Sequence, residues 1–146
     1  MGLGVDAICS SWDVSVRLLK KCRSVSATRI EAHIRKLVSF GTRNSLSDTE
    51  SDSRGIGAAR RWIKAELERC GAGTRMTVAF DVHRVESGPR VPRPTEFVNV
   101  VATLPGKTAR TVLIGGHIDS VNLRADVFTR RAPGANDGAS AVALTL

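Results

Sequence analysis

The sequence predicts an α/β domain with a partial mixed β-sheet flanked by helices. Two segments with helical periodicity come first, two alternating segments follow as a strand pair, and a nearly continuous apolar run then leads into a helix of small residues. Strands and helices that alternate in this way are typical of layered α/β domains. The 146 residues are enough for one domain with its own hydrophobic core and too few for two.

The predicted domain covers residues 25–146. Residues 1–24 carry no periodic pattern, so we leave this segment unassigned, as a poorly ordered arm, a leader or a misplaced start. The segment does not have the pattern of a secretory signal, because Asp6 and Asp13 interrupt it and no basic region precedes an apolar one.

Two amphipathic helices open the domain. Thr28 and Glu31 have the spacing of a capping box, and apolar residues follow at helical intervals until Gly41. His33 lies off that apolar stripe, so we expect it to be exposed. A second helix is predicted from about Arg54 to Cys70. Its expected buried face consists of Ile56, Ala59, Ile63 and Leu67.

Three strands and a final helix follow. Residues 76–82 alternate strictly between apolar and polar, and residues 97–104 form the second segment of an antiparallel pair. Residues 111–116 are almost continuously apolar, which predicts a central strand covered on both faces. Residues 139–146 have the pattern of the opening of a buried helix.

Composition excludes some classes of function. The net charge of +8 raises the question of nucleic-acid binding, but the basic residues are spread out, aromatics are only 4% and tyrosine is absent, so a solvated basic surface is favoured. No apolar run approaches the roughly 18 residues of a membrane span. The three cysteines have neither disulfide-framework nor CxxC spacing, and Cys70 is expected to be a small core residue.

The residues that could take part in catalysis or metal binding begin where the apolar run ends. His117 and Asp119 are two apart, so their side chains leave the same face of an extended segment, at the carboxyl end where α/β sheets place ligands. A carboxylate beside an imidazole supports a zinc-bound histidine by fixing its tautomer. Gly115 and Gly116 would let backbone approach closely. Taken alone, the pair is better explained as a buried histidine with an acidic partner.

A second candidate site residue is Asp137, between Asn136 and Gly138. It follows a Pro-Gly turn and precedes the last predicted helix. A carboxylate in such a place can bridge two metal ions, which share a hydroxide and polarise a carbonyl together. The small residues that follow leave room around it.

These motifs together resemble the M28 family of zinc peptidases, the leucyl-aminopeptidase-like group. The specific matches are the His117–Ser120 box and the segment Pro133–Ser140, and supportive matches in family order are residues 37–43, 54–63 and 99–106. The similarity covers residues 30–146 and corresponds to the N-terminal part, about the first half, of a family domain. It implies the zinc-exopeptidase fold, which is phosphorylase/hydrolase-like.

The resemblance also implies roles for individual residues. His117 would be a terminal zinc ligand, Asp119 the catalytic carboxylate that supports it, and Asp137 the ligand that bridges two Zn²⁺ ions. The Asp137–Gly138 peptide would be cis. The substrate would be a peptide with a free N-terminus, hydrolysed by an aminopeptidase. Family members are often secreted or periplasmic, although this sequence shows no export signal.

The departures from the family lead to a further expectation. The complete family site also contains a Glu-Glu pair, another Asp and a distant His, whereas no glutamate follows Glu96. Two ligand candidates are fewer than the three protein ligands usual for catalytic zinc. We therefore expect a truncated peptidase that is inactive by itself. The alternatives are a non-catalytic relative that acts as a binding module and a glutaminyl-cyclase-like acyltransferase.

Overall fold

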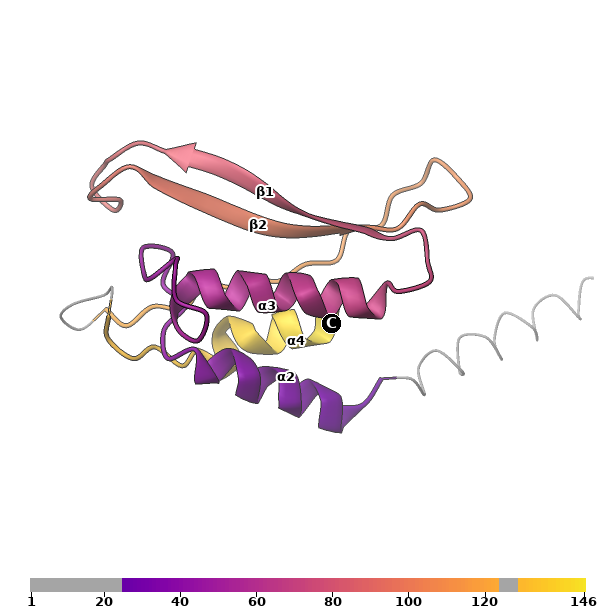
Figure 1. The fold of residues 1–146 in the computed structure, drawn as a ribbon, viewed down its shortest axis with the longest axis horizontal. Helices are drawn as coiled ribbons and strands as arrows, with labels where there is room; N and C mark the ends of the chain where they lie inside the picture. Colours follow the sequence, from indigo (N-terminus) through magenta and orange to yellow (C-terminus); the bar gives the residue numbers. More distant parts are fainter. Residues whose placement is uncertain (1–24, 124–128) are drawn as a thin grey trace, which may run out of the picture.

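The computed structural model describes residues 25–123 and 129–146, so the unassigned segment 1–24 lies outside the described residues. A two-stranded antiparallel hairpin lies over one helix, and two further helices lie on the other side of that helix (Figure 1). This arrangement is the α/β class in a partial form. The described elements are α2 (Ala27–Ser39), α3 (Gly55–Cys70), β1 (Thr77–Val85), β2 (Thr95–Thr103), the short π-helical turn η1 (Ala135–Ala139) and α4 (Ser140–Thr145).

Helix α2 begins slightly earlier than its capping-box spacing predicts. Ser26 rather than Thr28 is the N-cap, and its Oγ accepts a backbone N–H of the first turn at 3.3 Å. The expectation of an exposed His33 is wrong, since only 9% of the residue is exposed. The ring of Trp62 lies edge-on to His33 with centroids 5.7 Å apart, and Glu66 approaches its Nε2 to 3.8 Å. Helix α3 covers this side of α2, which the periodicity of α2 alone does not reveal.

Helix α3 is the middle layer of the molecule. Its bounds agree with the prediction to within one residue, and Gly71 is its C-cap. Cys70 at its end is exposed, and its Sγ donates to the carbonyl of Leu146 at 3.6 Å, so its prediction as a core residue is wrong. The core between α2, α3 and α4 consists of Leu37, Phe40, Ala58, Ala59, Ile63, Ala139 and Val142.

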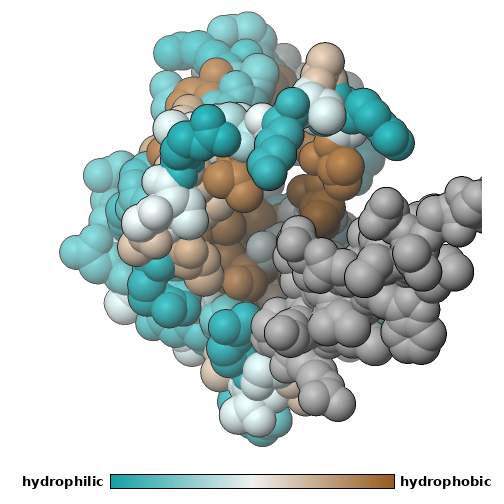
Figure 2. All heavy atoms as spheres, turned by 90° about the vertical axis from the view of Figure 1, so that its right-hand side faces the viewer, coloured by the Kyte–Doolittle hydropathy of each residue, from teal (hydrophilic) through white to brown (hydrophobic). Residues whose placement is uncertain are grey.

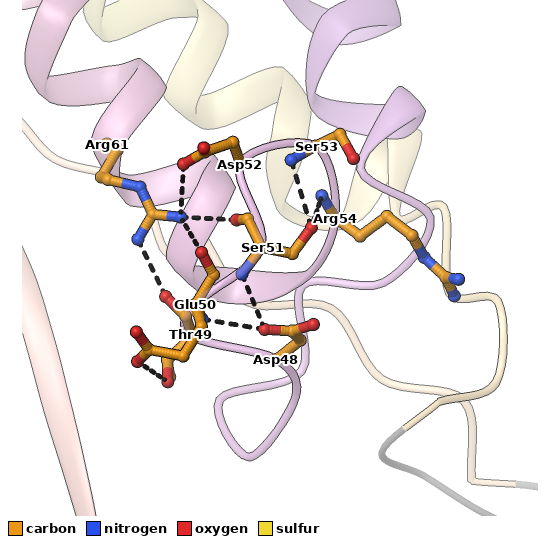
Figure 3. Close-up of polar contacts among 8 residues, drawn as sticks. All are labelled: Asp48, Thr49, Glu50, Ser51, Asp52, Ser53, Arg54 and Arg61. Atoms are coloured by element: carbon orange, nitrogen blue, oxygen red, sulfur yellow. Dashed lines mark hydrogen bonds and ion pairs between the residues drawn. The ribbon is translucent and has the colours of Figure 1, made fainter.

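The loop between α2 and α3 is held to α3 by Arg61 (Figure 3). Its guanidinium donates to the carbonyls of Thr49 at 2.8 Å and Glu50 at 3.2 Å, and also to the carbonyl of Ser51. Asp48 Oδ1 accepts the backbone N–H groups of Glu50 and Ser51 in the same loop. These contacts are local, because they join residues within 12 positions of one another.

The antiparallel hairpin of β1 and β2 is confirmed. Phe80 pairs with Val100 in its register, and Val100 packs against the core below. Lys64 of α3 lies 5.9 Å from the centroid of the Phe80 ring. His83 faces solvent as predicted, with its side chain 60% exposed, and pairs with Asp81 at 2.8 Å.

The predicted central strand at residues 111–116 is wrong. These residues belong to no strand, and the sheet in the described part of the chain consists of β1 and β2 only. Val112, Leu113 and Ile114 are 84%, 94% and 75% exposed. An apolar run becomes a strand only when neighbouring backbone supplies hydrogen bonds on its edges.

Figure 2 shows apolar residues at the bottom of a hollow on one side of the molecule.

The final helix is confirmed as a buried element. Val142 and Ala143 of α4 are each 3% exposed, and α4 and η1 both contact α2. None of the helices within the described ranges has the length and apolar character to span a lipid bilayer.

Candidate zinc site

The candidate site is formed by two segments that are close in space but separated in sequence. One is residues 117–120, and the other is residues 133–138, which lead through η1 into α4. Gly116 lies directly against α4, because a Cβ at this position would be 2.8 Å from the Cβ of Ala141. The close approach expected here is therefore present at Gly116, whereas a Cβ at Gly115 would meet no atom of the described residues within 4 Å.

The side chain of His117 lies between the two candidate carboxylates. Its Nδ1 is 3.1 Å from Asp119 Oδ1, and its Nε2 is 3.0 Å from Asp137 Oδ1. The side chains of His117 and Asp119 are 55% and 51% exposed, and that of Asp137 is 88% exposed. All three sequence-predicted residues are thus brought together at an accessible position.

Backbone geometry at Asp137 allows this approach. Residues 135–139 make one π-helical turn in which Asp137 has extended angles (φ −104°, ψ 98°), and the Ala139 N–H donates to the Gly134 carbonyl at 3.1 Å. The Asp137–Gly138 peptide is cis, as the family resemblance implies. Gly138 lies so close to the histidine that a Cβ there would be 2.6 Å from both Cε1 and Nε2 of His117.

Arg43, which is only 1% exposed, connects the two segments of the candidate site. Its Nε donates to the carbonyl of Ile118 at 2.8 Å, and its Nη1 and Nη2 donate to the carbonyls of Pro133 at 2.9 Å and Gly134 at 3.0 Å. Burial lowers the pKa of Arg43, while the nearby carboxylates of Asp119 and Asp137 raise it. Arginine nonetheless remains protonated at neutral pH.

Sequence patterns give little indication of Arg43. It follows a helix in a loop, where a basic residue is ordinarily solvated, and it stands out only as a member of the supportive match at residues 37–43. Its partners are backbone carbonyls, which carry no sequence signature. A buried arginine with carbonyl partners 75 to 91 positions away becomes evident only in three dimensions.

The donor atoms fit part of a zinc site. Zinc binds histidine nitrogen and carboxylate oxygen at about 2.0–2.2 Å, so two ligands of one tetrahedral ion lie about 3.3 Å apart. The 3.0 Å separation of His117 Nε2 and Asp137 Oδ1 is close to that value. Within residues 25–123 and 129–146, however, no group of three or more His, Cys, Asp or Glu side chains converges as a metal site. The described residues therefore bring one imidazole nitrogen and one carboxylate oxygen together, with a second carboxylate at the other nitrogen of the imidazole.

A groove of about 620 Å³ opens beside this cluster. It is lined by residues of β2, by Ile56 and Arg60 of α3, and by the segment that carries His117 and Asp119.

Comparison with known proteins finds sequences that are named as peptidases. The family model of peptidase family M28 matches residues 99–146, the region that contains both segments of the candidate site. A "Probable zinc metalloprotease" of Leptosphaeria maculans is 44% identical over 126 residues, which is 84% of this chain and 29% of the relative. A protein of the same name from Pyrenophora tritici-repentis is 37% identical over 148 residues, 99% of this chain and 30% of the relative.

A further relative has a more specific name. The "Leucine aminopeptidase 1" of Ajellomyces capsulatus is 32% identical over 127 residues, 87% of this chain and 29% of that protein. The chain spans about a third of the length of the curated relatives it matches. Residues 99–146 thus have the sequence pattern of peptidase family M28, and the chain as a whole is similar to part of proteins named as zinc metalloproteases.

Proposed function

We propose that this chain contributes part of the zinc centre of an aminopeptidase, with His117 and Asp137 as zinc ligands and Asp119 as the residue that orients His117. The observation that supports this most directly is the placement of the His117 ring, with one nitrogen facing each carboxylate at 3.0–3.1 Å. The substrate would be a peptide with a free N-terminus, in keeping with the family and with the leucine aminopeptidase relative.

The residues present have separate tasks in this proposal. Asp119 would accept the Nδ1–H of His117, which leaves the Nε2 lone pair available to a zinc ion shared with Asp137. Asp137 presents a carboxylate that is 88% exposed, so its second oxygen is open to another ion, as a bridging ligand requires. Two zinc ions held by these residues would supply an activated water and a Lewis acid for the scissile carbonyl.

Zinc binding by the chain tests the ligand assignment. We expect His117→Ala and Asp137→Ala each to weaken zinc affinity, measured by competition with a chromophoric chelator. Asp119→Asn is expected to weaken it by about 10–100-fold, the usual effect of losing a partner of a metal-bound histidine.

The chain contains a matched control. His83 and Asp81 form a second His–Asp pair two residues apart, at 2.8 Å, on the solvent face of the hairpin. We therefore expect His83→Ala to retain the zinc affinity of the unchanged chain. Equal losses in His83→Ala and His117→Ala would contradict the site assignment.

Turnover is a separate question from binding. A catalytic zinc normally has three protein ligands and one open position, and the described residues bring only two together. We expect no zinc-dependent release of product from aminoacyl-anilide substrates by the 146-residue chain. Robust turnover would contradict this part of the proposal. A folded chain without any zinc affinity would favour a non-catalytic binding module.

A further inference from the structure

We propose that Arg43 is a positioning residue that fixes the His117 and Asp137 segments relative to each other. The inference rests on the proposed function, because the two residues that it positions are the proposed zinc ligands. It assigns to Arg43 a task that local sequence does not indicate, namely to set the distance between two side chains through hydrogen bonds to backbone carbonyls near them.

The first support is the distribution of the guanidinium contacts. Each of three carbonyl partners lies near a proposed ligand: Ile118 directly follows His117, and Pro133 and Gly134 lie four and three residues before Asp137. The fourth partner is the carbonyl of Leu37, on the buried side of α2, at 3.0 Å. A planar guanidinium carries donors in a fixed fork. One rigid group therefore ties both ligand segments to the same helix.

The second support is a set of backbone contacts around the same arginine. Arg43 N–H donates to Ser120 Oγ at 3.0 Å, and Ser120 N–H donates to the carbonyl of Arg43 at 3.2 Å. Ser120 Oγ in turn donates to the carbonyl of Ala132 at 2.7 Å. The N–H of Ala132 donates to the carbonyl of Gly41 at 2.8 Å. Residues 41–43 thus join residues 118–120 and 132–134 through both backbone and side chain.

The third support is the lack of free space at the junction. Gly134 has a left-handed φ of 48°, and a Cβ there would be 2.4 Å from the Asp137 carbonyl oxygen and 2.8 Å from Arg43 Nη2. The segment that carries Asp137 is therefore pressed directly against the guanidinium. The positive charge also lies close enough to Asp119 and Asp137 to interact with both carboxylates.

A purely structural arginine would stabilise the fold without setting the ligand distance, and Arg61 provides that comparison. It also donates to three backbone carbonyls, but all belong to residues 49–51, remote in sequence from both ligand segments (Figure 3). Arg61→Met and Arg43→Met hence remove the same kind of group from two different places. Arg43→Lys adds a conservative variant, which keeps the charge and loses the planar fork.

The test uses a metal-free readout of the site. The ring of His117 lies against Gly138, so a nuclear Overhauser contact is expected between His117 Hε1 and the Gly138 α-protons. We expect Arg61→Met to keep this contact at full intensity. We expect Arg43→Met and Arg43→Lys, compared under conditions where near-UV circular dichroism shows a folded chain, to lose most of it.

The outcomes are distinct from those of the zinc experiment. An unchanged contact in folded Arg43→Met or Arg43→Lys overturns the inference, even if zinc binds. If both variants fail to fold, the role of Arg43 is in folding alone and the inference is also overturned. A lost contact in a folded variant supports it, whether or not the unchanged chain binds zinc. Where the chain does bind zinc, the affinity should fall about tenfold or more in Arg43→Lys and stay unchanged in Arg61→Met.

Discussion

Two arginines of this chain make similar hydrogen bonds, but the partners of one are near it in the sequence and those of the other are far away. Arg61 is 41% exposed at its side chain and holds a loop 9 to 12 residues away, whereas Arg43 is 1% exposed and joins segments up to 91 residues away. Both satisfy backbone carbonyls that helices and strands leave unpaired. The same kind of side chain therefore completes a loop in one place and joins the two segments of the candidate site in another.

The largest expected difference between the two arginines is in stability. Arg43→Met leaves four buried or partly buried carbonyls without their donor, at about 1–3 kcal/mol for each group that stays unsatisfied. We expect a loss of at least about 3 kcal/mol in the free energy of unfolding. Arg61→Met exposes its loop carbonyls to water and should cost about 1 kcal/mol. Urea unfolding followed by far-UV circular dichroism measures both, and equal losses would remove the distinction between them.

Two glycines extend the comparison to the backbone. Gly41 and Gly134 both have positive φ, of 78° and 48°, but a Cβ at Gly41 would meet none of the described atoms within 4 Å. Gly41→Ala should therefore cost only the left-handed conformation, about 1–2 kcal/mol. Gly134→Ala adds overlap with Asp137, Ser120 and Arg43, about 1–3 kcal/mol more. The same unfolding measurement should show a larger loss of stability in Gly134→Ala than in Gly41→Ala. A smaller loss in Gly134→Ala would mean that the residues around Gly134 can move apart to accommodate a methyl group.

The smallest expected effect concerns the loop held by Arg61. Two backbone N–H groups, from Ser51 and Glu50, hold the pKa of Asp48 below its usual range. A carboxyl whose pKa is lower in the folded state contributes stability above its unfolded pKa of about 3.9 and loses it as the pH falls through the folded pKa. We expect Asp48→Asn to show a shallower loss of thermal unfolding temperature below about pH 4. Identical acid profiles in Asp48→Asn and the unchanged chain would show that these contacts are not specific to the folded state.

The periodicity of apolar residues was sufficient to predict helix α3 and the hairpin. Helix α3 packs against the core through the face that its apolar spacing marks. The hairpin forms where the two segments predict it, but Phe80 and Val82 of β1 remain 38% and 52% exposed. Residues 111–116 carry an equally strong apolar signal, but a strand depends on partners that no local pattern reveals. Likewise, His33 is covered by α3, which spacing along α2 does not show.

The candidate site was predictable to a different degree. His117, Asp119 and Asp137 belong to short motifs with characteristic neighbours, so their proximity follows from family resemblance; their metal-binding roles remain a proposal. Arg43 acts through carbonyls, which every residue carries, and hence leaves no motif. The residues that do chemistry are easier to find in a sequence than those that set the distance between them.

The crowding at Gly138 has a consequence for how this region tolerates genetic change. Any amino acid other than glycine would place a carbon 2.6 Å from the imidazole of His117 and 2.4 Å from its carbonyl oxygen. Real Cβ atoms essentially never come so near another heavy atom, so a substitution must push the ring away. In a saturation library, the codon for residue 138 should therefore accept less variation than codons on the exposed face of the hairpin, although its product has no side chain at all.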